Sequence, residues 1–378
     1  MTTTLVTGGG GFIGSHLVDA LVELGHRVRV FDNLESQVHG LNSHKPGYLN
    51  PKAEFIIGDI RNINELKKAM ADIDVIFHEA SAVGSGQSLF EPSRYVATNS
   101  LGTANLLKVI IEKKIRIKKL IVASSMSVYG EGKYLCRHCG DVYPPPRSIG
   151  QMQLGQWEMK CPKCSANVTP LPIDETKPLA PTTVYGITKR DQEDLVMTVA
   201  KAYDIPAMIL RYFTVYGSRQ SLSNPYAGIL AIFISRILDE ESPHIFEDGL
   251  ETRDFVHVKD VVRANILALE SEIKHGVFNV GTGQPITILD LANLLINKLG
   301  SKVHPTLSGK FRLGDVRHGF ADISNVTNKL GFKPRIKIEN GIDDVIKWVR
   351  SKSAFEIRSS LDTFREFRKE AVRIGLTV

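Results

Sequence analysis

The sequence predicts an α/β fold: a doubly wound parallel sheet, a smaller mixed α/β lobe and an inserted four-cysteine module. Three observations carry this prediction. A strand, a glycine-rich turn, a helix and a second strand follow one another near the start, and strands and helices then alternate to about residue 217. Two C-x2-C pairs interrupt the alternation between residues 132 and 172. Such alternation favours a parallel sheet with crossover helices on both faces.

The first strand, residues 5–7, leads into a turn rich in glycine. Gly8, Gly11 and Gly14 lie three residues apart, so the backbone can bend sharply and approach a pyrophosphate without Cβ atoms in the way. The helix expected over residues 15–24 then directs free N–H groups at that anion. A glycine triplet also occurs in merely tight strand–helix connections. Here the flanking strand and helix supply the context of a dinucleotide-binding Rossmann fingerprint.

Asp32 ends the second strand (residues 28–32), eighteen residues after Gly14. A carboxylate at this point can accept hydrogen bonds from both hydroxyls of an adenosine ribose. A 2′-phosphate would meet a like charge, and at about 4 Å with an effective dielectric of ~20 the repulsion is on the order of 4 kcal/mol. Residues 33–36 offer no cation to offset it. We therefore expect NAD rather than NADP.

The composition favours a globular enzyme over a nucleic-acid or membrane protein. At 378 residues and 43% hydrophobic, the chain can bury a large core. The net charge is only +6, and the one dense basic run, residues 113–119, fits a solvated helix–strand connection. The first strand begins next to the initiator Met, and no apolar run has the length of a membrane span. We expect a cytoplasmic protein without nucleic-acid or membrane partners.

The remaining pattern divides the chain into lobes. Further strands are expected at 54–57, 75–78, 119–123, 208–210, 245–246 and 277–280, and further helices at 62–70, 94–112, 184–202, 229–238, 260–269, 288–299 and 341–349. We expect an NAD-binding Rossmann domain over 1–217, interrupted by 132–172 and rejoined by 254–280. A second lobe covers 218–253 and 281–350. An amphipathic helix over 351–378 is favoured over a partner-binding tail.

Tyr185 and Lys189 place a phenol and an ammonium one helical turn apart on one face. A phenol ionises near pH ~10, and bringing that value to about 7 takes on the order of 4 kcal/mol. Lys189 and a positive nicotinamide ring could supply this jointly, so Tyr185 becomes a general base for a sugar hydroxyl. Ser125, at the carboxyl end of a strand, would hydrogen-bond the same oxygen. A Tyr-x-x-x-Lys pair alone is common by chance, and it gains weight only after the dinucleotide fingerprint.

With these residues in place, the chain resembles the extended short-chain dehydrogenase/reductase family, in particular its nucleoside-diphosphate-sugar epimerases and dehydratases. The resemblance covers nearly everything except the insertion. It rests on Thr7-Gly8-Gly9-Gly10-Gly11-Phe12-Ile13-Gly14, Gly58-Asp59-Ile60, Asn99 with Gly102-Thr103, Ser125 ahead of Val128-Tyr129-Gly130, Tyr185 with Lys189, Arg211-Tyr212-Phe213, Arg253-Asp254-Phe255-Val256-His257-Val258, and Arg312-Leu313-Gly314-Asp315.

The resemblance implies roles for individual residues. Asp59 and Ile60 would flank the adenine, Lys189 would also hold the nicotinamide ribose, and Arg253 and Arg312 would clamp the substrate diphosphate. The implied cofactor-binding residues are Gly8, Gly11, Phe12, Ile13, Gly14, Asp32, Asn33, Asp59, Ile60, Ala80, Ser81, Asn99, Tyr185 and Lys189. The implied substrate-binding residues are Ser85, Ser125, Asn224, Arg253, Arg312 and Asp315, the last near the substrate ribose. Taken without the family, each arginine fits a surface ion pair equally well. A homodimer is also implied.

Two positions narrow the reaction. In the family's 4,6-dehydratases and decarboxylating members, an acid occupies one or both sites between the catalytic hydroxyl residue and Val-Tyr-Gly. Here Met126 and Ser127 stand at those sites, which favours oxidation and re-reduction at one carbon. The expected function is an NAD-dependent nucleoside-diphosphate-sugar 4-epimerase that works through a transient 4-keto sugar. One departure is Thr214, where the family usually has Asn.

The four cysteines form a separate module. Cys136 and Cys139 are followed, after twenty-one intervening residues, by Cys161 and Cys164. Two such knuckles predict a tetrahedral structural zinc that closes a small ribbon, since four thiolates leave no open position for a substrate. A redox dithiol pair, an iron–sulfur centre or a ligand role for His138 are the alternatives. The ribbon is expected beside the active-site mouth, as a lid or a subunit contact.

The insertion resembles one branch of the family. Stretches 124–130, 178–191 and 220–226 are similar to zinc-ribbon-containing dTDP-L-rhamnose 4-epimerases, which interconvert that sugar nucleotide with dTDP-6-deoxy-L-talose. The sequence leaves two alternatives open: a UDP-hexose 4-epimerase acting on UDP-glucose or UDP-GlcNAc, and a nucleotide-sugar oxidoreductase with net cofactor turnover. No residue of the pattern distinguishes thymidine from uridine.

Overall fold

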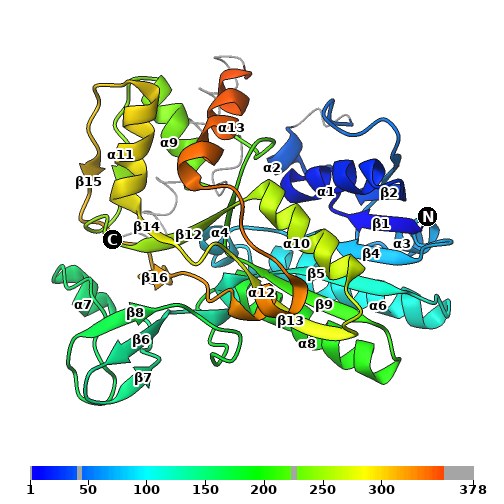
Figure 1. The fold of residues 1–378 in the computed structure, drawn as a ribbon, viewed down its shortest axis with the longest axis horizontal. Coiled ribbons are helices and arrows are strands. Elements are labelled where there is room, and N and C mark those ends of the chain that lie inside the picture. Colours follow the sequence, from blue (N-terminus) through cyan, green and yellow to red (C-terminus); the bar gives the residue numbers. More distant parts are fainter. Residues whose placement is uncertain (1, 41–44, 223–227, 353–378) are drawn as a thin grey trace.

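The computed structural model describes residues 2–40, 45–222 and 228–352, and its centre is a seven-stranded parallel sheet (Figure 1). The strand order is β13-β9-β5-β4-β1-β2-β3, with every neighbouring pair parallel. The strands are β1 (Thr3–Thr7), β2 (Arg27–Asp32), β3 (Glu54–Ile57), β4 (Val75–His78), β5 (Lys119–Ser125), β9 (Ala207–Tyr212) and β13 (His275–Val280). The predicted fold class is confirmed.

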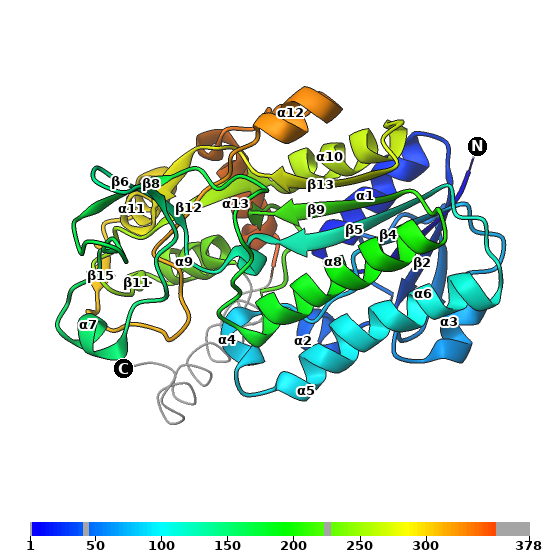
Figure 2. The same ribbon diagram turned by 90° about the horizontal axis from the view of Figure 1, so that it is seen from below.

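Helices cover both faces of this sheet (Figure 2). One face packs against α1 (Phe12–Glu23), α10 (Val258–Glu270) and α12 (Ser324–Leu330), and the other against α3 (Ile63–Ala69), α6 (Gly102–Glu112) and α8 (Val184–Ala202). Neighbouring residues of a strand belong to the hydrophobic cores on opposite faces of the sheet, since side chains alternate across a strand. In β1, Val6 packs in the core with α1 and Leu5 in the core with α3. The single helix expected over 94–112 is three segments: α5 (Pro92–Tyr95), a π-helical turn (Val96–Leu101) and α6.

The strand order reverses beside β1. β2 and β3 continue to one side of β1, whereas β4 and β5 continue to the other. The loops after β1 and β4 therefore part at the carboxyl edge of the sheet, and such a switch point opens the crevice in which doubly wound folds bind ligands.

The second lobe is mixed, as expected. Strand β12 (Thr252–His257) pairs with β10 (Thr214–Tyr216) and β16 (His318–Gly319) in parallel and with β14 (Pro285–Thr287) antiparallel. A short parallel pair joins β11 (His244–Ile245) and β15 (Thr306–Leu307). Helices α9 (Ile229–Leu238), α11 (Ile288–Leu299) and α13 (Ile338–Arg350) close an apolar core over β12. Two short helices, α2 (Ser36–His39) and α4 (Ser85–Ser88), lie at the crevice.

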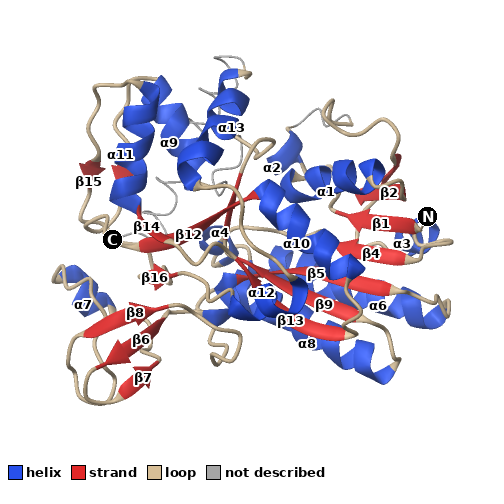
Figure 3. Ribbon diagram, viewed as in Figure 1, coloured by secondary structure: helices blue, strands red, loops and turns tan. Residues whose placement is uncertain are grey.

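The inserted module contains more regular structure than its composition predicts. Strands β6 (Lys133–Cys136), β7 (Gly140–Val142) and β8 (Val168–Leu171) form an antiparallel sheet in the order β7-β6-β8, with α7 (Ile149–Gln153) beside it. Tyr134, Val142 and Met159 pack in its small core. The module lies next to the second lobe (Figures 1 and 2), and β16 is the strand of that lobe beside it (Figure 3).

Two sequence-based expectations fall outside the described residues: the helix proposed for most of 351–378, and Asn224. Among the helices of the described ranges, none combines the length and the apolar character that crossing a membrane requires.

Candidate active site

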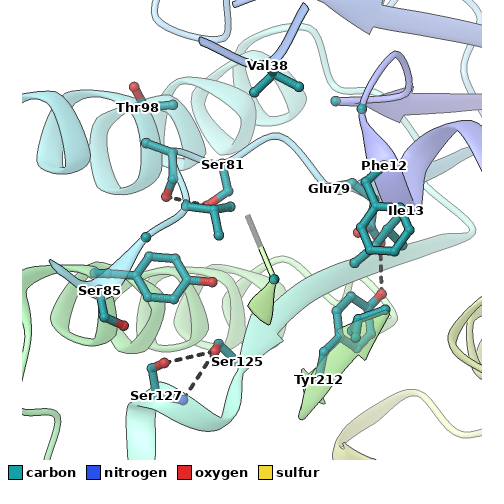
Figure 4. A pocket seen from close by; sticks show the side chains of 18 of the residues that line it. Phe12, Ile13, Val38, Glu79, Ser81, Ser85, Thr98, Ser125, Ser127 and Tyr212 are labelled. Carbon is teal, nitrogen blue, oxygen red and sulfur yellow. Dashed lines mark hydrogen bonds between the residues drawn. The ribbon is translucent and has the colours of Figure 1, made fainter. Parts of the chain in front are cut away.

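A pocket of about 590 Å³ runs along the carboxyl ends of β1, β2, β4 and β5 and reaches the loop 312–316 of the second lobe (Figure 4). Its volume is in the range of small-ligand sites. Most residues that the sequence singled out line it: Gly8, Gly11, Phe12, Ile13, Gly14, Asp32, Asn33, Ile60, Ala80, Ser81, Ser85, Ser125, Tyr185, Arg253, Arg312 and Asp315. Asp59, Asn99 and Lys189 are not part of this lining.

The turn between β1 and α1 has room for an anion and none for side chains. Gly8 has φ +70°, and a Cβ there would lie 2.6 Å from the amide nitrogen of Ala80. A Cβ on Gly14 would collide with the carbonyl oxygen of Gly8. Gly11 precedes α1 without a side-chain cap, so the first N–H groups of the helix stay available. This cradle fits a pyrophosphate.

The carboxylate of Asp32 is fixed by backbone donors. Its Oδ2 accepts a hydrogen bond from the Gly10 amide at 2.9 Å and its Oδ1 one from the Leu34 amide at 2.8 Å. Each carboxylate oxygen can accept further bonds, and Asp32 lines the pocket, so the geometry suits a ribose diol. Asn33 donates from Nδ2 to Oδ2 of Asp59 at 3.0 Å. The hydrogen bond from Arg61 holds the pKa of Asp59 at about 2, so Asp59 is a carboxylate at neutral pH.

Ser125 and Tyr185 reach the pocket from two different elements. Ser125 is the last residue of β5, and its Oγ donates to Oγ of Ser127 at 3.2 Å (Figure 4). Tyr185 lies in the first turn of α8, which begins here because Oγ1 of Thr183 caps the helix by accepting from the Gly186 amide at 3.1 Å. The Tyr185 ring packs edge-on against Tyr95, with 6.3 Å between ring centroids.

Lys189 follows one turn later and is 3% exposed. Its Nζ donates to the carbonyl oxygen of Ala123 at 2.9 Å. Burial lowers the pKa of Lys189 to about 8, although Glu79 and Glu193 raise it. Burial also raises the pKa of Tyr185 to about 12, with Ser125 lowering it and Glu79 raising it further. These contacts of the protein keep the phenol protonated at neutral pH.

Glu79 is a pocket residue that the sequence analysis missed. It directly follows β4, and its Oε1 accepts from the Tyr212 hydroxyl at 2.8 Å (Figure 4). Asn265 in turn donates to that hydroxyl at 2.7 Å. Burial raises the pKa of Glu79 to about 7. The available signal was its position: an acid directly after a strand beside the switch point.

Asn99 shapes the loop after β4 from behind. Its Oδ1 accepts from the Ala82 amide at 2.8 Å and from the Ser81 hydroxyl at 3.1 Å, while its Nδ2 donates to Oγ1 of Thr188 at 2.9 Å. The π-helical turn that carries Asn99 is thereby joined to α8 and to the pocket wall.

The second lobe contributes two guanidinium groups that converge on one acid. Arg253 on β12 donates from Nη2 to Oδ1 of Asp315 at 2.8 Å, and Nε of Arg312 lies 3.8 Å from Oδ2 of the same carboxylate. Burial raises the pKa of Asp315, but the charges of Arg253, Arg312 and Arg147 together hold it below its usual value. Paired guanidinium groups at a pocket wall can hold a diphosphate.

The four cysteines meet in space. The Sγ atoms of all four cysteines, Cys136, Cys139, Cys161 and Cys164, lie within 4.8 Å of one another. The Sγ atoms of Cys136 and Cys164 are 3.5 Å apart. Disulfide-bonded sulfurs would be about 2 Å apart, whereas tetrahedral Zn–S bonds of about 2.3 Å place sulfurs roughly 3.8 Å apart. The donor set fits a closed four-thiolate zinc site.

Comparison with known proteins places the chain in a family. The profile of the "NAD dependent epimerase/dehydratase family" matches residues 4–148 and 163–281. The chain belongs to this family. Within the inserted module, residues 149–162 fall outside the match.

Relatives and solved structures cover nearly the whole chain. A dTDP-L-rhamnose 4-epimerase of Burkholderia thailandensis is 36% identical over 91% of this chain and 94% of its own length. A putative UDP-glucose 4-epimerase of Methanocaldococcus jannaschii is 34% identical over 92% and 99%. The solved UDP-glucuronic acid 4-epimerase of Bacillus cereus, in complex with UDP-glucuronic acid and NAD, has a TM-score of 0.75 at 29% identity, over 92% of this chain and 99% of that one. The prediction of an NAD-dependent nucleotide-sugar 4-epimerase is confirmed at this level of detail.

Proposed function

We propose that this epimerase interconverts dTDP-L-rhamnose and dTDP-6-deoxy-L-talose by inverting C4. The observation that carries the chemistry is the convergence of the glycine turn, the strand-end Ser125 and the helical Tyr185 on one pocket. Val83 and Met126 line the same pocket and offer apolar contacts for a C6 methyl group. The Burkholderia thailandensis relative supports the choice of sugar.

The residues divide the work. Asp32 and Lys189 would hold the two ribose ends of NAD, and the bound cofactor would supply the acceptor and the donor of the C4 hydride. Tyr185 takes the proton of the C4 hydroxyl, and Ser125 hydrogen-bonds the same oxygen. Arg253 and Arg312 together hold the diphosphate while the 4-keto sugar turns about its bond to the diphosphate. Tyr185 would then return its proton to the C4 oxygen once the turned sugar presents its other face to the cofactor.

The residues after Ser125 support epimerisation over elimination. Met126 and Ser127 both line the pocket, and neither side chain ionises near neutral pH. Elimination at the neighbouring carbons needs a further acid or base at this point.

A UDP-hexose 4-epimerase is the second candidate. Its support is the Methanocaldococcus jannaschii relative and a solved UDP-N-acetylglucosamine 4-epimerase of Methanobrevibacter ruminantium, with a TM-score of 0.76 at 33% identity over 93% of this chain and 99% of that one. A guanidinium pair that holds the diphosphate does not recognise the base, so it would serve either nucleotide equally well.

The test is a substrate panel followed by NMR of the anomeric protons. Pure protein is incubated separately with dTDP-L-rhamnose, UDP-glucose, UDP-galactose and UDP-GlcNAc. We expect a new anomeric signal for 6-deoxytalose from the first and the highest kcat/KM for it. Conversion of a UDP-hexose at a higher kcat/KM would replace the proposed substrate with the second candidate, and release of NADH would indicate a net oxidoreductase.

We further propose one structural zinc per chain at Cys136, Cys139, Cys161 and Cys164, a homodimer, and a cytoplasmic location. The sulfur cluster supports the zinc, and the family resemblance supports the dimer. Elemental analysis of protein purified without chelator should give about one zinc per chain, and light scattering should give twice the chain mass of 41.8 kDa. Absence of zinc, or a monomer mass, would remove the respective proposal.

A further inference from the structure

The inserted module reaches the substrate side of the pocket through one stretch of chain. This stretch, residues 140–160, is an excursion within the module that joins Cys139 to Cys161. This excursion carries Arg147, Trp157 and Glu158, and each of them contacts residues of the second lobe. The two cysteines that bound the excursion belong to the four-sulfur cluster, so a metal there would fix both of its ends.

Arg147 makes the most direct connection. Its side chain is 1% exposed and forms a two-pronged pair with Glu247, from Nη1 to Oε2 at 2.7 Å and from Nη2 to Oε1 at 2.9 Å. The same Nη2 lies 3.4 Å from the carbonyl oxygen of Asp315. The Glu247 amide donates to the carbonyl oxygen of Lys310 at 2.8 Å. Arg147 therefore contacts one end of the loop 310–315 directly, at Asp315, and is connected to the other end, at Lys310, through Glu247.

Arg317 forms the second connection, from the other side of the same loop. It is fully buried, and its guanidinium donates to Glu158, Glu247 and Asp248 over 2.5 to 3.0 Å. Its carbonyl oxygen accepts from Nη1 of Arg253 at 3.3 Å. Glu247 and Asp248, two acids of the second lobe that cluster here, are thus paired with guanidinium groups.

An aromatic contact completes the interface. Trp157 packs against Phe311, with 6.2 Å between ring centroids, and Phe311 is 2% exposed. The next residue, Arg312, lies over the ring of Phe246 at 4.4 Å and lines the pocket. Phe311 is thus buried under the insertion while its neighbour faces the ligand.

We propose that Arg147, Trp157 and Glu158 of the insertion are positioning residues for the nucleoside-diphosphate site, because they fix the loop that presents Arg312 and Asp315. This inference rests on the proposed function in that Arg253 and Arg312 bind the substrate diphosphate. The insertion contacts no residue of the glycine turn or Asp32 among the hydrogen bonds and ion pairs of the described ranges, so NAD binding does not depend on it.

The test separates nucleotide binding from cofactor binding and from catalysis. Arg147→Lys keeps the charge beside Glu247 but loses the planar two-pronged geometry. Arg137→Lys, an exposed site on the same insertion, is the matched control. Calorimetric titration of NAD-loaded protein with dTDP and with UDP gives the affinity, cofactor extraction gives the NAD content, and turnover gives kcat and KM. Glu158→Gln, at a side chain 56% exposed, is a milder second variant.

We expect Arg147→Lys to weaken binding of the nucleotide and to raise KM by about tenfold, the effect of one lost charge-assisted hydrogen bond. Its kcat and NAD content stay at the wild-type values, Glu158→Gln shows a smaller shift of the same kind, and Arg137→Lys none. Unchanged nucleotide affinity in both variants overturns the proposal, as does a parallel loss of NAD content, which indicates general destabilisation. Failure of wild-type protein to bind either nucleotide overturns the proposed function and this inference with it.

Discussion

The two sides of the pocket are built in contrasting ways. The cofactor side is built from residues close in sequence, because the glycine turn and Asp32 lie within 25 residues of one another. The backbone of the turn shapes this side and also holds the Asp32 carboxylate. The substrate side joins Arg253, Arg312 and Asp315 from separate segments and braces them through the insertion. One side is therefore specified by short-range spacing, and the other by pairing between distant segments.

This contrast teaches where each side can fail. On the cofactor side, a single added Cβ collides with neighbouring backbone, because the turn packs closely where side chains are missing. On the substrate side, a substitution far from the ligand can act through the loop it supports. The following predictions test that difference, from the largest expected effect to the smallest.

The largest effect, on kcat, is expected for Tyr185, which lies between the cofactor side and the substrate side of the pocket. Tyr185→Phe keeps the ring and its packing on Tyr95 but removes the hydroxyl, so we expect kcat to fall by about a thousandfold while NAD stays bound. Tyr203→Phe, at the exposed end of α8, is the control and should leave kcat unchanged. Turnover followed by NMR and NAD content by extraction provide the measurements, and substantial residual epimerisation would exclude Tyr185 as the base.

Gly8→Ala tests the cofactor side alone. The added Cβ would lie 2.6 Å from the Ala80 amide nitrogen at a φ of +70°, so we expect NAD affinity to fall by at least about tenfold. Gly25→Ala is the matched control, because Gly25 has a similar φ of +81° with nothing within 4 Å of its Cβ position. If both variants lost NAD affinity equally, the cause would be backbone strain at a positive φ and not the close packing of the glycine turn.

Metal removal tests the substrate side. Chelation should release about one zinc per chain and weaken dTDP or UDP binding by about fivefold, since the ends of the excursion 140–160 are then no longer fixed. NAD content should not change. Cofactor extraction measures the NAD content, and a zinc-sensitive dye measures the zinc released. Loss of NAD in proportion to the zinc released would contradict the independence of the cofactor side from the substrate side.

The pH dependence gives the smallest effect. Burial lowers the pKa of Lys189 to about 8, so its ammonium is lost as pH rises through that value, and kcat/KM should fall on the alkaline side. Lys189→Arg keeps the charge, because a guanidinium stays protonated, and should remove this alkaline limb. An alkaline limb of the same position in the Arg variant would assign it to another group.

The sequence predicted what depends on local spacing. The alternating elements, the glycine turn, Asp32 and the cysteine pairs each have a short-range pattern, and the structure brings Ser125 and Tyr185 to one pocket as expected. Strand β12 was not predicted, because it contains polar residues that are not typical of a buried strand. One of them, Asp254, accepts hydrogen bonds from backbone amides of neighbouring segments inside the lobe.

Long-range partners had no comparable signal. The pairing of Arg147 with Glu247 joins residues one hundred positions apart, and that of Arg317 with Glu158 joins residues 159 apart. A charged residue in a loop-rich insertion is typical of solvated surface, so only the three-dimensional arrangement identifies Arg147 as buried and Glu158 as paired with Arg317. Glu79 was missed for a different reason: its role depends on a hydroxyl contributed by β9.

The most direct test of the account follows one hydrogen atom. Protein carrying only its own NAD is given the sugar nucleotide with deuterium at C4, and the product is analysed by NMR and mass spectrometry. The account predicts that the C4 epimer keeps its deuterium, because the hydride leaves and returns on the same cofactor. Loss of deuterium to solvent, or accumulation of free deuterated NADH, would contradict it.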